Sequence, residues 1–371
     1  MLQAVVRELA QEKIAPRAAE IDDKGEYPWD MKELLARQDL LALPFPEKYG
    51  GTGSDLFTFC LVVEEIAKVC ASSSLIVLVQ ALGSFPILIA GTETQKQRYF
   101  PKLASGDWLA AFALTEPGAG SDAAAMKTRA VLEGDHYVLN GSKCFITNAG
   151  IAQVYSVFAM TDPHKGVKGI SAFIVDADSP GFRLGKIEHK MGIRGSQTGE
   201  LVFDNCIVPV GNLLGNEGDG FKIAMMTLDK SRPGVGAQAV GIAQGALDYA
   251  ARYAKERVQF GAPIANLQAI QFMLADMAMQ VEAARCLVYE AAARVDAGEK
   301  GITMSSAMAK CFAGDVAMRV TTDALQVLGG YGYMKEYPLE RMMRDAKITQ
   351  IYEGTNQIQR LVIARALLAS Y

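Results

Sequence analysis

The sequence IYEGTNQIQR, residues 351–360, lies near the carboxyl end of the chain between two segments with helical apolar spacing. Gly354 permits a positive φ angle or a close approach of a ligand to the backbone. Thr355 or Asn356 can cap a helix that starts there. This stretch therefore predicts a junction between two helices, with the single carboxylate of Glu353 at the turn.

Glu353 follows the apolar Ile351 and the aromatic Tyr352, so we expect its side chain to be partly shielded from water. Desolvation disfavours the ionised form of a carboxyl group and can bring its pKa into the range of a useful general base. A surface glutamate in an ordinary turn is an equally good interpretation of this stretch alone. The choice between the two depends on the rest of the chain.

Composition narrows the class of protein. The chain has 371 residues, which suits two or three domains, and half of them are hydrophobic. A net charge of −4 with no long basic run argues against a nucleic-acid partner. The six cysteines form no CxxC pair and the three histidines are dispersed, so we expect no disulfide framework and no metal site. Reduced cysteines predict a cytoplasmic protein. A mitochondrial matrix form with its transit peptide removed is the alternative.

Residues 1–107 predict an N-terminal helical domain. A loop rich in proline and glycine at 44–53 precedes three helical segments near 54–71, 73–90 and 93–104. Segment 73–90 is apolar enough to raise the question of a membrane span. Polar residues, a glycine and Pro86 interrupt it, so we interpret it as a buried core helix that ends near Pro86 and expect no membrane span.

Residues 108–215 predict a middle domain of β-barrel or β-sandwich type. β-Branched and aromatic residues alternate in short segments at 131–132, 136–139, 155–160, 170–175 and 201–208. Gly134-Asp135 and Asn140-Gly141 stand where turns between strands are expected.

Residues 216–371 predict a C-terminal helical domain of four-helix-bundle type. Two apolar stripes at helical spacing indicate long helices with broad buried faces: Ile270, Leu274, Met277, Val281, Ala284 and Val288, then Met308, Phe312, Val316 and Val320. Small residues at 234, 237, 241 and 245 would let another helix come close. The fold class is therefore α+β, with a β domain between two helical domains.

Two segments of the middle domain carry groups suited to a ligand. LTEPGAGSD, residues 114–122, ends the first strand, and its glycine-rich turn offers backbone N–H groups and a serine hydroxyl to polar atoms. In FITN, residues 145–148, Phe145 and Thr147 share one face of a strand, which suits a flat ring with a hydrogen-bonding edge. An ordinary tight turn and a packed strand end explain the same residues without a ligand.

The C-terminal domain offers two further segments. In the polar run 229–232, Arg232 supplies a planar fork of donors, although a solvated helix turn would look the same. Arg257, in the segment 257–261 that closes a long helix, can contact a ligand or simply offset the helix dipole. No GxGxxG sequence follows a strand, which disfavours a Rossmann nucleotide-binding fold.

Taken together, these segments resemble the acyl-CoA dehydrogenase family, nearest to its short- and medium-chain, butyryl-CoA dehydrogenase-like members. The resemblance covers nearly the whole chain and rests on specific motifs: LTEPGAGSD (114–122), FITN (145–148), MGIRGSQT (191–198), DKSRP (229–233), ERVQFG (256–261), LQVLGGYGY (325–333) and IYEGTNQIQR (351–360). It implies the same order of a helical domain, a β domain and a helical bundle.

The resemblance also implies roles for individual residues. Glu353 matches the catalytic base; some family members carry that base at a position that matches Ser231, where a serine cannot serve. The positions that match the FAD site are Phe112, Leu114, Thr115, Gly120, Ser121, Phe145, Thr147, Arg257, Gln259, Phe260, Gln268, Gln326, Gly329, Gly330, Thr355 and Gln357. The positions that match the acyl-CoA site are Ser121, Asp229, Arg232, Gly354 and Arg365.

The implied reaction is the FAD-dependent α,β-dehydrogenation of an acyl-CoA thioester to a trans-2-enoyl-CoA. Glu353 would remove the α proton, the β hydride would pass to flavin N5, and the electrons would pass to electron-transferring flavoprotein. The resemblance further implies a homotetramer, a dimer of dimers, with some FAD contacts made across a subunit boundary.

Two other functions fit the same scaffold. An acyl-CoA oxidase would return its electrons to oxygen, although oxidases usually carry an extra C-terminal domain. A catalytically silent flavin-binding protein would not need Glu353. Segment 73–90, which forms part of the acyl pocket in relatives, contains no Arg, Lys, Asp or Glu. We therefore expect a neutral, short- to medium-chain acyl group, with a cyclic, branched or dicarboxylic acyl-CoA as the alternatives.

Overall fold

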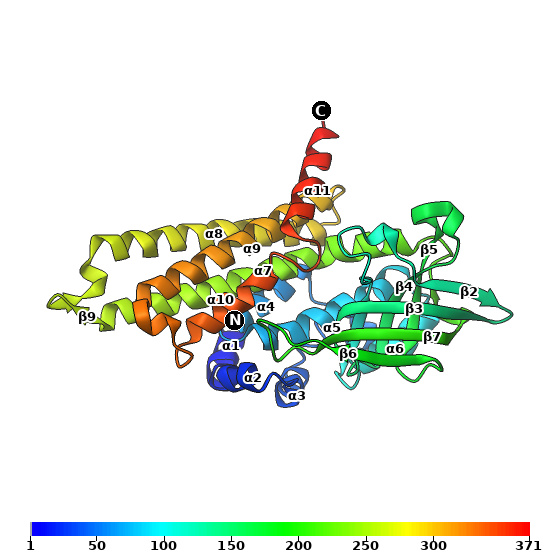
Figure 1. Cartoon of the computed structure of the whole chain (residues 1–371), viewed down its shortest axis with the longest axis horizontal. Helices are drawn as coiled ribbons and strands as arrows, with labels where there is room; N and C mark the ends of the chain where they lie inside the picture. Colours follow the sequence, from blue (N-terminus) through cyan, green and yellow to red (C-terminus); the bar gives the residue numbers. More distant parts are fainter. Residues whose placement is uncertain (1) are drawn as a thin grey trace.

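The structure is a computed structural model that describes residues 2–371. The sheet lies at one end of the long axis, and a bundle of long helices extends to the other end (Figure 1). The predicted order of a helical, a β and a helical region is confirmed. The helices of the N-terminal region are α1 Leu2–Leu9, α2 Ala18–Lys24, α3 Trp29–Arg37, α4 Leu56–Ala67, α5 Ala71–Ala90 and α6 Glu93–Ala104.

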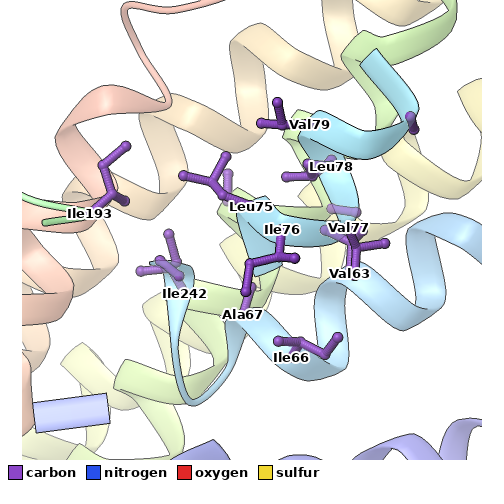
Figure 2. Close-up of a cluster of buried hydrophobic side chains, with 14 of the residues drawn as sticks. Val63, Ile66, Ala67, Leu75, Ile76, Val77, Leu78, Val79, Ile193 and Ile242 are labelled. Atoms are coloured by element: carbon purple, nitrogen blue, oxygen red, sulfur yellow. The ribbon is translucent and has the colours of Figure 1, made fainter. Parts of the chain in front are cut away.

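Helix α5 is the central core helix of this region. Its side chains pack against Val63 and Ile66 of α4, Ile193 of a loop and Ile242 of a C-terminal helix (Figure 2). The helix is long and apolar enough to cross a membrane, but 78% of its most apolar window is buried within the protein. The predicted end near Pro86 is wrong, because the helix continues to Ala90. Pro86 lies in its last turns, where the missing N–H removes one hydrogen bond only.

The middle region is built on one hydrogen-bonded sheet with the strand order β6-β7-β3-β2-β4-β5-β8, and β1 pairs in parallel with β4. Strands β2 and β4 share a single residue pair, Arg129 with Met160, so the sheet consists of two halves that meet at one point. The strands are β1 Ala110–Ala113, β2 Arg129–Glu133, β3 His136–Thr147, β4 Val154–Met160, β5 Ile170–Asp176, β6 Phe182–Ile187, β7 Thr198–Pro209 and β8 Leu213–Leu214.

One of the two predicted turns in this sheet is correct and the other is wrong. Gly134-Asp135 connects β2 to β3, where Glu133 pairs with His136. Asn140-Gly141 instead lies inside β3, at a shift of register against β7. Gly141 has a φ of 147°, and a Cβ there would lie 2.6 Å from the Thr128 hydroxyl, so the glycine serves a bulge rather than a turn. Strand β6 was not predicted, because it has no clear apolar alternation.

The C-terminal region contains α7 Gly220–Glu256, the short strands β9 Val258–Gln259 and β10 Ala262–Pro263, α8 Gln268–Asp296, α9 Ile302–Leu328, α10 Pro338–Ile348 and α11 Asn356–Leu368. The predicted stripe of α8 is largely buried, but Phe312 of the α9 stripe is exposed. The buried face of α9 is formed mainly by alanines one position away, which let α9 lie close to α7. Helix α11 projects away from the rest of the chain (Figure 1).

Glycines on α7 let α4 pack close to it, as the sequence predicted. A Cβ at Gly241 would lie 2.4 Å from the carbonyl oxygen of Glu64, and one at Gly245 would lie 2.0 Å from that of Lys68. These distances are shorter than any relaxed contact between a carbon and an oxygen atom. The contact fixes α7, which carries one wall of the site described below, against the core of the N-terminal region.

We expect Gly245→Ala to destabilise the protein by about 1–3 kcal/mol, the usual cost of overpacking. Helix propensity alone would favour alanine by about 1 kcal/mol, so the sign of the change isolates the steric effect. Gly211→Ala is the control, because nothing lies within 4 Å of a Cβ at that position. The measurement is denaturant unfolding of both variants at one protein concentration. A Gly245→Ala variant as stable as the control would contradict the close contact.

Candidate active site

The junction between α10 and α11 holds Glu353 in an uncommon backbone conformation. Glu353 has a φ of 53° and Gly354 a φ of 93°. A positive φ at a residue other than glycine is costly and persists only where the surroundings enforce it. Of the two predicted caps, Thr355 is the actual one, since its hydroxyl accepts a hydrogen bond from the Ile358 N–H at 3.3 Å.

The Glu353 carboxylate points into the protein rather than into solvent. Part of the residue is exposed, but protein surrounds its carboxyl group, and the Ser231 hydroxyl of α7 donates a hydrogen bond to Oε2. Burial raises the pKa of Glu353; the hydrogen bond from Ser231 and the charges of Arg232 and Lys310 limit this rise. The sequence prediction of a shielded carboxylate with a raised pKa therefore agrees with the geometry.

Asp229 and Arg232 lie on the same stretch of α7 as Ser231. Arg232 is buried and donates to the Asp229 carboxylate at 2.6 Å, and the Thr303 hydroxyl donates to the other oxygen of Asp229 at 2.5 Å. Burial lowers the pKa of Arg232, while Asp229 and Glu353 oppose this effect. The Arg232 Nε is buried and finds no acceptor in the part of the chain that the structure describes. A donor of this kind is available to a ligand.

A buried ion pair joins the two candidate segments of the middle domain. The Lys143 ammonium donates to the Glu116 carboxylate at 2.7 Å and to the Leu114 carbonyl at 3.1 Å. Glu116 also accepts hydrogen bonds from the N–H groups of Lys127 and Thr128. Burial opposes the ionisation of both groups, yet Lys143 keeps the pKa of Glu116 below its usual value, and the pKa of Lys143 falls only to about 8. Both groups are therefore charged at neutral pH.

This ion pair fixes the turn at 115–122 beside the end of β3. The Cys144 N–H donates to the Thr115 carbonyl at 2.9 Å, which brings Thr115 next to Phe145. Phe145 has a φ of 57° and its ring is 67% exposed, while Ile146 is buried and Thr147 is partly exposed. Phe145 and Thr147 are thus the more exposed residues on either side of Ile146, but Phe145 lies where β3 shifts register against β7, so the strand alternation assumed in the prediction does not hold there. Phe112 and Leu114 of the adjoining segment are largely packed within the domain, and Gly120 and Ser121 are exposed.

A second group of predicted residues surrounds a cavity of about 570 Å³ at the far end of the bundle, next to β9. Its lining includes Arg257, Gln259, Phe260, Gln326, Gly329 and Gly330. The Arg257 guanidinium lies over the Tyr331 ring, 5.3 Å from its centre, and the Phe260 ring is 93% exposed. Gln268 is exposed at the start of α8, one residue beyond the lining residue Leu267.

The predicted residues therefore form three groups, and one chain does not bring them all together. Glu353 and Gly354 lie at the junction beside α7 and α9, where Arg232 acts on the Glu353 carboxylate and is itself paired with Asp229. The group near Phe145 belongs to the sheet region, whereas β9 and its cavity lie at the other end of the bundle (Figure 1). Thr355 lies at the junction, whereas Gln357 and Arg365 are exposed on α11.

Several residues of the site were not predicted. Lys310 on α9 is fully buried and donates to the Gly354 carbonyl at 2.8 Å, and the Gln359 side chain donates to the same carbonyl at 3.0 Å. Lys143 and Glu116 were missed as well. The available signal was a lysine within an otherwise apolar stretch, as in Ala307–Ala313, because such a residue needs a buried partner.

Comparison with known proteins identifies the class. Family models described as the N-terminal, middle and C-terminal domains of acyl-CoA dehydrogenase match residues 1–107, 111–206 and 218–368. These models, the fold and the buried carboxylate define an oxidoreductase of the acyl-CoA dehydrogenase type.

Relatives match the chain along nearly its whole length. "Probable acyl-CoA dehydrogenase FadE25" of Mycobacterium tuberculosis is 54% identical over 99% of this chain and 94% of its own length. Cyclohex-1-ene-1-carbonyl-CoA dehydrogenase of Geobacter metallireducens is 54% identical over 98% of this chain and 96% of its own length. The chain therefore belongs to the acyl-CoA dehydrogenase family.

Solved structures agree with this assignment. Butyryl-CoA dehydrogenase of Megasphaera elsdenii superposes with a TM-score of 0.96 at 51% identity. The match covers 99% of this chain and 98% of the butyryl-CoA dehydrogenase chain. A chain from a structure described under the electron transferring flavoprotein of Acidaminococcus fermentans has a TM-score of 0.97 at 53% identity, covering 99% of this chain and 97% of its own.

We expect Lys143→Met to destabilise the protein by about 3–5 kcal/mol, because it leaves the Glu116 carboxylate buried without a cation. The double variant Glu116→Gln with Lys143→Met removes the stranded charge and recovers part of this loss. Urea unfolding of the wild type, Lys143→Met and the double variant under one condition measures both the loss of stability and its recovery. If the double variant is less stable than Lys143→Met, the ion pair is not the source of the cost.

Proposed function

We propose that this chain catalyses the FAD-dependent α,β-dehydrogenation of an acyl-CoA thioester to a trans-2-enoyl-CoA, with Glu353 as the base that removes the α proton. The observation that carries this proposal is a carboxylate with a raised pKa, held by Ser231 at a strained helix junction in a chain of the acyl-CoA dehydrogenase family. A raised pKa suits proton abstraction, since a base works best when its pKa is near the working pH.

The backbone at the junction supports the same role. Within residues 2–371, the Glu353 N–H donates to no protein acceptor. It is therefore free to donate to the thioester oxygen, where negative charge develops as the α proton leaves. A donor of this kind typically lowers the barrier by about 3–4 kcal/mol. The left-handed conformation of Glu353 thus leaves an N–H without a protein acceptor in the same residue as the buried carboxylate.

The residues of the chain fit FAD as the cofactor. Phe145 exposes an aromatic ring beside the Thr147 hydroxyl, which suits a flat ring with polar edges. The cavity near β9 combines an arginine, amide side chains and two glycines with apolar walls, which suits a dinucleotide. When bound, FAD would accept the β hydride at N5. The turn at 115–122, fixed by Glu116 and Lys143, would then hold the flavin edge at the sheet.

The acyl-CoA would lie between α7 and the Gly120-Ser121 turn. Arg232 lies near the Glu353 carboxylate and is paired with Asp229, Gly354 follows Glu353 in the turn, Ser121 is exposed on its own turn, and Arg365 is exposed on α11 where it could meet an outer part of CoA. Arg232 offers an Nε without a protein acceptor. Its partner Asp229 is fixed by Thr303, so the guanidinium is oriented before substrate binds.

The acyl group is neutral and short to medium in length under this proposal. Helix α5 contributes no charged side chain, so it offers no counter-ion to a distal carboxylate. The relatives include one named for a cyclic substrate, cyclohex-1-ene-1-carbonyl-CoA, and a structure of butyryl-CoA dehydrogenase. Anaerobic titration with butyryl-, octanoyl-, cyclohexenecarbonyl- and glutaryl-CoA, followed by flavin bleaching, ranks the candidates directly.

The electrons pass to electron-transferring flavoprotein in this proposal, in keeping with the structure from Acidaminococcus fermentans. The chain acts in the cytoplasm, and α5 serves as a core helix rather than a membrane span. An oxidase would differ in one observable. Substrate-bleached flavin of a dehydrogenase recovers its colour slowly in air, whereas that of an oxidase recovers at once.

We expect Glu353→Gln to retain FAD and to bind acyl-CoA, but to lose about 10²–10⁴-fold in turnover. Glutamine keeps the shape and can still accept from Ser231, but it cannot take a proton. Glu133→Gln, at an exposed position on β2, is the control and should retain full activity. Anaerobic stopped-flow bleaching measures the step itself. A near-normal rate in Glu353→Gln would show that another group is the base.

The active form is a homotetramer, a dimer of dimers, in which one chain completes the FAD site of another. Two observations support this assembly: the Phe145 group belongs to the sheet region while the β9 group lies at the far end of the bundle, and α11 projects with exposed Leu361, Leu367 and Leu368. The exposed rings of Phe145 and Phe260 and the exposed leucines of α11 form apolar surface that a second copy would cover.

A complementation experiment tests this assembly. The variants Glu353→Gln and Arg257→Met are each expected to be nearly inactive, but a co-expressed mixture should recover up to about half of the activity in mixed pairs. In such a pair, the intact Glu353 of one chain meets the intact Arg257 of the other. Light scattering of the wild type should give four times the mass of the chain. Activity of the mixture no higher than that of the single variants would place both residues in one chain's site.

A further inference from the structure

A buried lysine holds the junction that carries Glu353, although no step of the proposed reaction uses it. Lys310 lies on α9 and has no exposed surface. Its ammonium donates to the Gly354 carbonyl at 2.8 Å and to the Asn356 Oδ1 at 2.9 Å. Removing an ammonium from water costs several kcal/mol, so a buried lysine of this kind calls for a role beyond packing.

The acceptors of Lys310 lie immediately after the strained residue. Glu353 and Gly354 both have a positive φ, and the Gln359 side chain donates to both of their carbonyls, at 3.1 and 3.0 Å. Lys310 and Gln359 thus converge on the Gly354 carbonyl. Without these donors, a carbonyl turned inward would be buried and unsatisfied, at a cost of about 1–3 kcal/mol. Their hydrogen bonds enforce the left-handed turn.

Asn356 extends this hold to both sides of the junction. Its side-chain N–H₂ donates to the Cys311 carbonyl at 3.0 Å and to the Asp315 carboxylate at 2.8 Å, so its oxygen faces Lys310. Asp315 also accepts from Gln350, which precedes the junction, at 2.7 Å. Helix α9 therefore holds the chain both before and after Glu353. Between these two contacts, the Lys310 ammonium holds the Gly354 carbonyl.

The charge of Lys310 is less compensated than that of its neighbour Arg232. Arg232 is paired directly with Asp229, whereas the two acceptors of Lys310 are a neutral carbonyl and a neutral amide. Burial lowers the pKa of Lys310 to about 8, and Glu353 opposes that fall. The titratable and charged groups that act on Lys310 are Glu353 of the junction, Arg232 of α7, and Cys311 and Asp315 of α9; Arg360 of α11 pairs in turn with Asp315.

We infer that Lys310 is a positioning residue for the dehydrogenation: its ammonium holds residues 353–356 in the turn that presents the Glu353 carboxylate and N–H to the substrate, and it places one positive charge beside that carboxylate. This inference rests on the proposed function. Lys310 does not contact the reacting carbons and takes no proton from them.

The sign of the electrostatic effect is definite. A positive charge near a carboxyl group lowers its pKa, so loss of Lys310 should raise the pKa of Glu353 further. Glu353 acts as a base only when it is ionised. The acid limb of kcat/KM against pH should therefore move to higher pH when the charge is removed, and stay in place when it is kept.

The experiment compares Lys310→Met, Lys310→Gln and Lys310→Arg with the wild type, all loaded with FAD, using butyryl-CoA and an artificial electron acceptor. In Lys310→Met we expect kcat to fall about 100-fold from misplacement of the base, with KM changed much less. The acid limb should move upward in Lys310→Met and Lys310→Gln. Lys310→Arg should keep the limb near its wild-type position.

Two controls separate positioning from stability. Val320→Ala, also fully buried on α9, should lower the unfolding midpoint without moving the acid limb. Lys310→Gln retains a donor and serves if Lys310→Met loses FAD. Neutral variants that hold FAD, keep kcat within twofold and leave the limb in place would overturn the inference, as would a loss of stability alone. A normal rate in Glu353→Gln would instead overturn the proposed function, so the two failures are distinguishable.

Discussion

The site depends on burying one carboxyl group beside groups that favour its ionised form. Protein surrounds the Glu353 carboxyl group, and three groups keep it usable: the Ser231 hydroxyl, the Arg232 guanidinium and the Lys310 ammonium. Each comes from α7 or α9, the pair of helices in closest contact in the bundle. The packing of these two helices therefore determines the chemistry of the junction, because a small change in their separation would alter all three interactions together.

The fold was readable from the sequence wherever a segment has one clear period. The long helices and the strands β4 and β5 follow from apolar spacing alone. The errors have local causes. Asn140-Gly141 has the composition of a turn, but Gly141 is needed where Thr128, just before β2, leaves no room for a side chain. Phe312 matched an apolar stripe, but the close contact of α9 with α7 selects alanines instead.

The site was only partly readable, for a different reason. Glu353 was singled out because a glycine and a capping residue mark a junction, which are local signals, but its role as a base was implied only by the resemblance to the family. Lys310, Lys143 and Glu116 act through partners that are far away in the sequence, so no local pattern reveals them. The division of the predicted cofactor residues between the sheet region and the far end of the bundle could not be predicted either, since a motif gives a residue's identity without its position in space.

The contact between Ser231 and Glu353 has an evolutionary consequence. The two residues are 122 positions apart in the sequence, yet a side chain leaving α7 at 231 ends where the carboxylate from the junction ends. An acidic residue at position 231 would place its carboxyl group where the Glu353 carboxyl group now ends. Under the proposed function, mutation could thus transfer the proton acceptor from one helix to another, and descendants of one ancestor could differ in their essential residue without differing in their chemistry.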